Sequence, residues 1–315
     1  MRSVTARAPG RRWGWAIASL APAVVGACTG QTLTLGRSAP GRYHFEVPQL
    51  VAELRSDART DNPTLTADLL EIFFTSDRNG NGDVWTARRS TRSQPFVSPT
   101  PVAEVNTSMF ETSAAISADG LTVWFGSDRP GSGLTDIWVS NRPNRSASWL
   151  TPANVVALNT AADDIPRPPG EHGLVMPLSS KQGASAVYQT FLAARASAGA
   201  PFGTPVLISE LAYPDRSTVD GFLTDDGLTL FYSSAPLQAT ADGAVTTDGG
   251  VPTADLYVAW RRSVNETFSE TQPLDDLNTP GDERDPWLTP DGKTLYFTSD
   301  RDGALNIYTA SVKPR

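Results

Sequence analysis

Residues 75–85, TSDRNGNGDVW, space oxygen-bearing side chains as the opening of a calcium-binding loop does. In a helical calcium loop the twelfth position supplies a bidentate carboxylate, and the twelfth position counted from the first aspartate is Arg88. An aspartate followed by glycines also makes a tight turn, since the aspartate caps its own backbone and glycine adopts positive φ readily. We therefore predict a turn, with a single calcium site as the alternative. The ligands of that site would be Asp77, Asn79, Asn81 and Asp83.

Other chemically suggestive residues lack the partners that their chemistry needs. The DGKT at 291–294 imitates the end of a phosphate-binding loop, but the glycine required five positions before Gly292 is Trp287. The sequence contains no G-x-S-x-G elbow, and its two histidines, His44 and His172, have no zinc-binding spacing. These residues predict neither nucleotide binding nor a serine hydrolase, and we expect no cofactor.

The elements that must position any site come from an internal repeat. The opening stretch recurs as GSDRPGSGLTDIW at 126–138 and as TSDRDGALNIY at 298–308, each time after an apolar run. Two degenerate copies begin at Leu178 and Ser233. Polar turns precede all five apolar runs, which is typical of hairpins between alternating strands. The repeat therefore predicts five similar all-β units.

A second repeated pair marks the end of each unit, an aromatic residue followed nine positions later by Leu or Val. The last unit reaches the end of the sequence before its own pair appears, and the missing pair, Phe45 and Leu54, lies near the start. We therefore predict a closed five-bladed β-propeller with four-stranded antiparallel blades, in which residues 45–54 complete the last blade and protect its edge. The other pairs are Phe96/Val105, Trp149/Leu158, Phe202/Leu211 and Phe268/Leu277.

The fourth unit is longer than the others. Its Gly/Thr/Asp-rich insertion, residues 236–255, lies between two predicted strands. Helical periodicity is nearly absent, so residues 45–315 are predicted to form one all-β domain.

Residues 288–310, LTPDGKTLYFTSDRDGALNIYTA, resemble the repeat of the TolB-like propellers, a family related to WD-repeat propellers. One copy of the repeat is close to the family consensus, two others match it well, and the remaining two match it poorly. The resemblance covers most of residues 45–315 and implies the propeller fold. It leaves function open, because members of the family include envelope scaffolds and propellers fused to peptidases.

In a propeller the first strand of each blade lines the central axis. Alignment on the hairpin turns places Asn62, Ser113, Asp220 and Asp285 at equivalent positions near the start of that strand. Trp287 follows on the same strand and offers a ring for stacking on a sugar or a peptide. The predicted ligand-binding funnel comprises Asn62, Glu111, Asp164, Arg167, Asp220, Arg284, Asp285 and Trp287.

This funnel supports two functions. Carboxylates roughly 5–10 Å apart on such an axis would suit glycoside hydrolysis, which several families of five-bladed propellers perform. Residues 281–286, GDERDP, belong to the family repeat, however, so the same groups are also expected as structural links between blades. Since no activated nucleophile or metal cage is recognisable, we expect a binding or scaffolding module without catalysis, and a carbohydrate-active hydrolase or lyase as the alternative.

The N-terminus resembles a lipoprotein signal. Four arginines precede an uncharged run, residues 13–27, that is too short for a confident membrane span, and VGAC at 25–28 is similar to a lipobox. Cys28 is the only cysteine, which places the single thiol where a lipid anchor requires it and excludes an intramolecular disulfide. We expect residues 1–27 to be a signal peptide, Cys28 to carry the lipid and residues 28–44 to be a linker.

Charge limits the partners of the mature protein. Removal of residues 1–27 takes away four arginines and no acidic residue, so the formal charge falls from −8 to −12. An acidic surface disfavours nucleic acid and anionic lipid, which both require clustered Lys and Arg. We expect a monomeric, lipid-anchored protein of the bacterial envelope, on the periplasmic face of the outer membrane or on the cell surface, whose partner is an envelope protein or a glycan.

Overall fold

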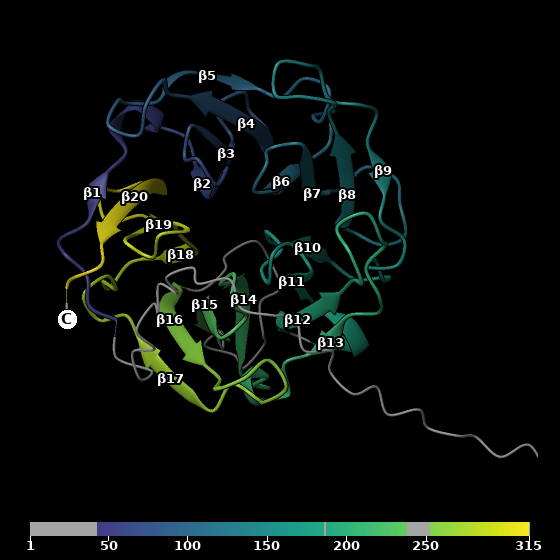
Figure 1. Cartoon of the computed structure of the whole chain (residues 1–315), viewed down its shortest axis with the longest axis vertical. Coiled ribbons are helices and arrows are strands. Elements are labelled where there is room, and N and C mark those ends of the chain that lie inside the picture. Colours follow the sequence, from purple (N-terminus) through teal and green to yellow (C-terminus); the bar gives the residue numbers. More distant parts are fainter. Residues whose placement is uncertain (1–42, 186, 238–252, 315) are drawn as a thin grey trace, which may run out of the picture. The chain divides into compact units, whose positions relative to one another are not determined.

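The computed structural model describes residues 43–185, 187–237 and 253–314, which form a ring of five four-stranded antiparallel sheets (Figure 1). Each sheet is one blade, and the described residues are almost entirely strands and turns. The five-bladed propeller predicted from the repeats is therefore confirmed. The predicted signal peptide, Cys28, nearly all of the linker and most of the 236–255 insertion lie outside the described residues.

In the first four blades the strands run from inner to outer in chain order, whereas the outer strand of the fifth blade is β1 (Gln49–Leu50). The blades are numbered by their inner strands from the N-terminus. The inner strands are β2 (Thr60–Leu65), β6 (Glu111–Ile116), β10 (Asp164–Pro166), β14 (Arg216–Leu223) and β18 (Glu283–Leu288). The second strands are β3 (Glu71–Ser76), β7 (Thr122–Ser127), β11 (Val175–Ser180), β15 (Thr229–Pro236) and β19 (Thr294–Ser299). The third strands are β4 (Asp83–Arg88), β8 (Asp136–Asn141), β12 (Gln189–Ala194), β16 (Asp255–Trp260) and β20 (Asn306–Ser311). The outer strands are β5 (Val97–Pro101), β9 (Ala153–Asn154), β13 (Val206–Leu207), β17 (Glu270–Pro273) and, for the fifth blade, β1 (Gln49–Leu50).

The two ends of the described chain close the ring. Strand β1 pairs antiparallel with β20, so that Gln49 lies opposite Thr309, and an isolated bridge joins Phe45 to Val312. Figure 1 shows the purple N-terminal strand beside the yellow C-terminal one. The predicted completion of the last blade by residues 45–54 is confirmed, and it pairs an edge that would otherwise be open.

Short polar turns join the first two strands of the blades. In the second blade Ser117 donates to Asp119 Oδ1 at 2.6 Å, and Asp119 Oδ1 accepts from the Leu121 backbone N–H at 2.9 Å. Gly120 has φ +75°, a conformation that costs glycine little. The same Ser/Thr and Asp pairing occurs at Thr66 and Asp68, at Thr224 and Asp226, and at Thr289 and Asp291.

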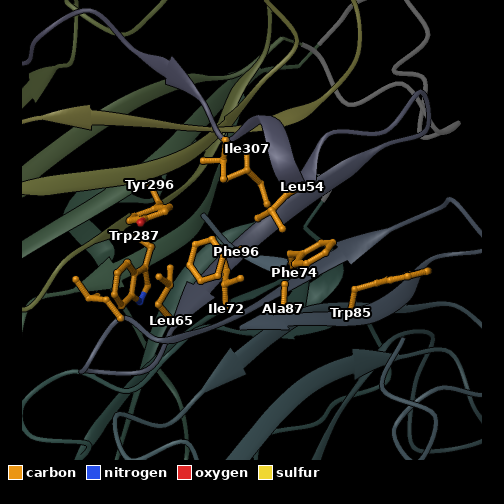
Figure 2. Close-up of a cluster of buried hydrophobic side chains, with 12 residues drawn as sticks. Leu54, Leu65, Ile72, Phe74, Trp85, Ala87, Phe96, Trp287, Tyr296 and Ile307 are labelled. Carbon is orange, nitrogen blue, oxygen red and sulfur yellow. The ribbon is translucent and has the colours of Figure 1, made fainter. Parts of the chain in front are cut away.

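The hydrophobic core lies between blades as well as within them. Figure 2 shows one such cluster, in which side chains of the first blade pack against Trp287, Tyr296 and Ile307 of the fifth. Phe96 and Leu54, predicted to mark the ends of units, are both buried there. The repeated pairs are therefore packing positions that join one blade to the next.

An arginine directly after the third strand covers the repeated aromatic ring in four blades. Arg142 Nε donates to the Gly120 carbonyl at 2.7 Å, and its guanidinium lies 4.4 Å from the Trp149 ring centroid. The stacking orders the loop between the third and outer strands. This position was not among those predicted from the sequence, although an arginine recurs there. The four residues are Arg89, Arg142, Arg195 and Arg261.

Among residues 43–185, 187–237 and 253–314, helical structure is limited to three single turns, η1 (Ala52–Leu54), η2 (Gln182–Ala184) and η3 (Ser209–Leu211). Within the three described segments, no helix has the length and apolarity needed to cross a membrane.

Candidate functional site

Four of the five inner strands carry the same irregularity where the blades meet the axis. The pairing of each strand with its neighbour shifts there, and a residue other than glycine has positive φ. Such a conformation costs about 1–3 kcal/mol, so the surrounding contacts must hold it. The residues are Asn62 (55°), Ser113 (51°), Asp220 (58°) and Asp285 (56°). These are the four positions that the sequence aligned, and their equivalence is confirmed.

Three of these residues link neighbouring blades through hydrogen bonds. Ser113 Oγ donates to Asn62 Oδ1 at 2.9 Å, and the Asn62 backbone N–H donates to Asp285 Oδ2 at 3.1 Å. Thr298 Oγ1 donates to the same Asp285 oxygen at 2.9 Å. The second, first and fifth blades are thus connected across buried positions.

The third blade contributes an arginine. Its inner strand β10 ends at Pro166, and Arg167 follows with only 1% of its surface exposed. Arg167 Nη1 donates to Asn62 Oδ1 at 2.9 Å and lies 3.4 Å from Asp285 Oδ1. Its Nε and Nη2 groups are buried without a hydrogen-bond partner. We call Asn62, Ser113, Arg167, Asp220 and Asp285 the axial cluster.

Asp220 is the member of the axial cluster that keeps partial access to solvent. Its backbone N–H donates to Ser179 Oγ at 3.2 Å, and the charges of Arg167 and Arg284 act on its carboxyl group. Burial and the nearby Asp285 raise the pKa of Asp220 to about 7, against the opposing effects of Arg167 and Arg284. Near neutral pH this carboxyl group can therefore both donate and accept hydrogen bonds.

Asp61 is a neighbour of the cluster that the sequence analysis missed. Its carboxylate lies 3.4 Å from Arg59 Nη1, and burial followed by the charge of Asp285 raises the pKa of Asp61 to about 6, although Arg59 opposes the change. The corresponding residues of other blades are Thr112 and Arg284. Because this position differs among blades, the repeat gave no signal for it.

The predicted funnel residues separate into three environments. Arg284, in the fifth blade, is partly exposed and pairs with Asp282 at 2.6 Å. Glu111 and Asp164 are completely buried at the first positions of their inner strands, where they bond to side chains of their own blades. Trp287 is 4% exposed and packs against Phe222 and Tyr296, as Figure 2 shows for Tyr296. Of the predicted residues, Asp220 and Arg284 therefore keep partial exposure to solvent.

The stretch that resembles a calcium loop forms the turn between β3 and β4. Asp77 accepts from Arg59 Nε at 3.1 Å and Nη2 at 3.0 Å, and Asn81 donates to the Met109 carbonyl at 2.7 Å. Asn79 donates to Asp83 at 3.4 Å. These contacts are those of a turn fastened to the neighbouring blade. Over the described residues, no three His, Cys, Asp or Glu side chains come together as a metal site.

The two histidines lie at the surface. His44 Nδ1 is 3.1 Å from Asp276, and His172 Nδ1 is 3.2 Å from Asp225. Both pairs are exposed to solvent, and neither belongs to the axial cluster.

A groove of about 230 Å³ lies between the first and second blades, beside Trp149. Its arginines already have acidic partners, since Arg88 and Arg142 both contact Glu71. The groove therefore presents an ion-paired contact between blades, and the axial cluster remains the better candidate for a ligand site.

Comparison with known proteins shows similarity of fold but does not assign a function. The sequence matches no protein-family model and no curated protein. In fold the chain is similar to the endo-arabinase from Bacteroides thetaiotaomicron VPI-5482, with a TM-score of 0.54 and 12% identity over 86% of this chain and 98% of that one. The catalytic domain of the GH62 α-L-arabinofuranosidase from Coprinopsis cinerea gives a TM-score of 0.53 and 10% identity over 86% and 97%.

TolB from Acinetobacter baumannii gives a TM-score of 0.50 and 13% identity. That match covers 83% of this chain but only 56% of TolB, so this chain spans little more than half of that protein. The resemblance to TolB-like propellers is confirmed in the fold. At these identities the comparisons show only that this chain shares the propeller fold with TolB, with the endo-arabinase and with the α-L-arabinofuranosidase, and they do not distinguish a binding scaffold from a hydrolase.

Proposed function

We propose that this protein is a non-catalytic binding propeller, which recognises an envelope protein or a glycan at the axial cluster. The observation that carries this proposal is the position of Asp220. Three inner strands hold their left-handed residues in a buried network, whereas the fourth places Asp220 at a position that keeps partial access to solvent. A half-buried polar group on a rigid scaffold is suited to recognising a ligand.

The buried contacts around Asp285 favour binding over catalysis. Asp285 is 2% exposed and is held by Asn62, Thr298 and Arg167, so its oxygens are already engaged. A catalytic carboxylate must reach substrate or water, and Asp285 reaches neither in this arrangement.

The test compares the purified protein with two single variants on a glycan array and against extracts of envelope proteins. Asp220→Ala removes the accessible carboxyl group, and Glu270→Ala removes an exposed carboxylate from outer strand β17 of the same blade. We expect Asp220→Ala to lose at least tenfold in affinity while Glu270→Ala binds as the wild type does. Equal binding by both variants, at unchanged melting temperature, would exclude recognition at the axial cluster.

We also propose that Cys28 carries a lipid that holds the propeller at the bacterial envelope, because the lipobox-like VGAC ends with the only cysteine of the chain. Fractionation of cells that express the wild type and Cys28→Ser tests this proposal. The wild type should sediment with membranes and the variant should not, and sedimentation of both would refute the anchor.

A hydrolase is the second candidate, favoured by the pKa of Asp220. A carboxyl group with a pKa of about 7 beside another carboxyl group is the arrangement of a general acid and its partner. Because one structure of similar fold is an endo-arabinase and another is an α-L-arabinofuranosidase, arabinan is the first substrate to assay. If Asp220→Asn lowers the turnover of arabinan at least a hundredfold, the hydrolase function would replace the binding function. If the variant retains the turnover, the hydrolysis does not depend on Asp220 and would be assigned to a contaminant.

A further inference from the structure

The turn between β3 and β4 contains the same dipeptide twice, Asn79–Gly80 and Asn81–Gly82. Asparagine followed by glycine is chemically labile, because the backbone nitrogen of the second residue can attack the side-chain amide carbon of the first. Glycine has no Cβ to hinder that approach. The two dipeptides have the same local sequence but different surroundings in the folded protein, so the structure distinguishes their reactivity.

The reaction requires only the protein, water and base. The glycine N–H loses its proton to base, its nitrogen forms a bond to the asparagine Cγ, and the bond from Cγ to Nδ2 breaks. The side-chain nitrogen takes a proton from water and leaves as ammonia. Water then opens the cyclic imide at either of its carbonyl carbons, which yields aspartate or isoaspartate. Each conversion replaces a neutral amide with a negatively charged carboxylate.

The first dipeptide is exposed and is held only loosely. Asn79 and Gly80 both lie at the surface, and Asn79 Nδ2 donates to Asp83 Oδ2 at the long distance of 3.4 Å. Gly80 has φ +96°, and apart from its chain neighbours no heavy atom lies within 4 Å of the position of a Cβ. Its N–H donates to the Asp77 carbonyl at 2.7 Å. This hydrogen bond must open before the nitrogen can react, and it lies within the turn itself.

The second dipeptide is fastened to the neighbouring blade. Asn81 Nδ2 donates to the Met109 carbonyl at 2.7 Å, on the loop that leads into β6. Gly82 is buried, and a Cβ at this position would collide with the Phe110 ring. The Gly82 carbonyl also accepts from the Glu111 backbone N–H at 2.8 Å. Ring closure at Asn81 must therefore break contacts between the first and second blades.

We infer that Asn79 is a site of spontaneous deamidation in the folded protein, and that contact with the second blade protects Asn81 from the same reaction. The local opening of an exposed turn costs less free energy than an opening that separates packed blades. The product is an aspartyl or isoaspartyl residue, and it adds a negative charge to a turn that already contains Asp77 and Asp83.

The fifth blade shows how the turn accommodates an aspartate. Asp302 occupies the position of Asn79 there, in TSDRDG against TSDRNG. Gly303 has φ +97° and donates to the Asp300 carbonyl at 2.7 Å, which is the geometry of the first blade. The aspartyl product therefore fits the same turn. Isoaspartate has an additional carbon in the backbone, so it changes the spacing that this hydrogen bond requires.

The first experiment incubates the purified wild-type protein at mildly alkaline pH and maps its peptides by mass spectrometry, with separation of the Asn, Asp and isoAsp forms. We expect Asn79 to convert at least about tenfold faster than Asn81, because the second reaction waits for contacts between blades to open. Equal rates, or faster conversion of Asn81, would refute the inference.

The same incubation in urea provides the control, since unfolding removes both surroundings. Both asparagines then precede glycine in an unfolded chain and should convert at rates within about twofold of each other. If the preference for Asn79 has the same size in urea, the second blade does not protect Asn81. If both residues convert in urea and neither converts in the folded protein, Asn79 is not a site of deamidation.

Variants identify the reacting residue by its charge. Isoelectric focusing of the aged wild type should show an acidic form that Asn79→Gln lacks, because glutamine must close a larger ring and reacts far more slowly. The matched variant Asn81→Gln should retain the acidic form. Persistence of that form in Asn79→Gln, at the rate of the wild type, would place the reaction elsewhere and refute the site.

Asn79→Asp makes the aspartyl product directly. Its Tm should stay within about 2 °C of that of the wild type, because the fifth blade holds an aspartate in the same turn. A larger fall in Tm would refute the correspondence between the two turns.

Discussion

At the scale of the residue, Asp220 combines partial exposure with a raised pKa. Burial and the charge of Asp285 raise that pKa from the ordinary 3.8 to about 7, so between these two pH values the folded protein holds a proton that the unfolded chain releases. Stability contributed by the protonated group is therefore present below about pH 3.8 and is lost as the pH rises through 7. Ionisation of Asp220 works against folding.

We expect Asp220→Asn to gain stability relative to the wild type as the pH rises. The asparagine retains the shape of the side chain and cannot ionise, so the difference in unfolding free energy between variant and wild type should be on the order of 2 kcal/mol more favourable at pH 8 than at pH 4. Urea unfolding at both pH values measures this difference. A difference in unfolding free energy that is independent of pH would show that Asp220 ionises in the folded protein as it does in water. Glu270→Gln, at an exposed position, is the control, and its difference from the wild type should not change with pH.

At the scale of the element, the arginine that follows the third strand in four blades joins a loop to the neighbouring hairpin. Arg142 has an additional role, because its Nη2 contacts Glu71 of the preceding blade at 2.6 Å and Glu71 is buried. Arg195 stacks on Phe202 at 4.5 Å and donates to the Gly173 carbonyl at 2.8 Å. Within the part of the chain that the structure describes, Arg195 makes no ion pair with a carboxylate, so the two arginines differ by one ion pair.

We expect Arg142→Ala to lower the free energy of unfolding by about 3 kcal/mol and Arg195→Ala by about 1 kcal/mol. The first variant leaves the buried Glu71 with only the partly exposed Arg88, whereas the second removes stacking and one hydrogen bond. Urea denaturation of both variants measures the two values. If the losses are equal, the ion pair between blades adds nothing to the stacking.

Arg142→Lys extends this test. Lysine keeps the charge but has no planar group to lie over Trp149 while bonding to both Gly120 and Glu71. It should therefore recover less than half of the loss, and full recovery would show that charge alone matters at this position.

At the scale of the whole molecule, closure of the ring depends on a short N-terminal strand. Residues 45–54 supply β1 and η1, and they place Phe45 and Leu54 in two different core clusters. Without them, β20 has no outer neighbour and both clusters lose a fully buried side chain. Exposed strand edges pair with other molecules.

We expect deletion of residues 29–54 to cause aggregation or a fall in Tm of at least about 10 °C, whereas deletion of residues 29–42 should leave Tm within about 2 °C of the wild type. The second deletion controls for the loss of the linker alone. Size-exclusion chromatography and thermal unfolding provide the readouts. A monomeric, equally stable product of the longer deletion would mean that β1 does not close the ring.

The number of blades, the closure by residues 45–54 and the alignment of the four left-handed residues could all be predicted from the sequence. These features follow from patterns repeated within each unit, namely apolar strands, polar turns and an aromatic pair, which every unit must reproduce in order to pack against the next. Trp287 was correctly placed on an inner strand, but its burial depends on Phe222 and Tyr296, which the repeat does not specify.

Only the tertiary structure decided which polar residues meet at the axis and which remain accessible. Arg167 and Asn62 are 105 residues apart, and their contact depends on how the third blade faces the first. Asp164 and Glu111 begin inner strands as predicted, but they belong to a buried site within their own blades. Accessibility is set by the packing of all five blades around one axis, and no repeat carries that information in its own residues.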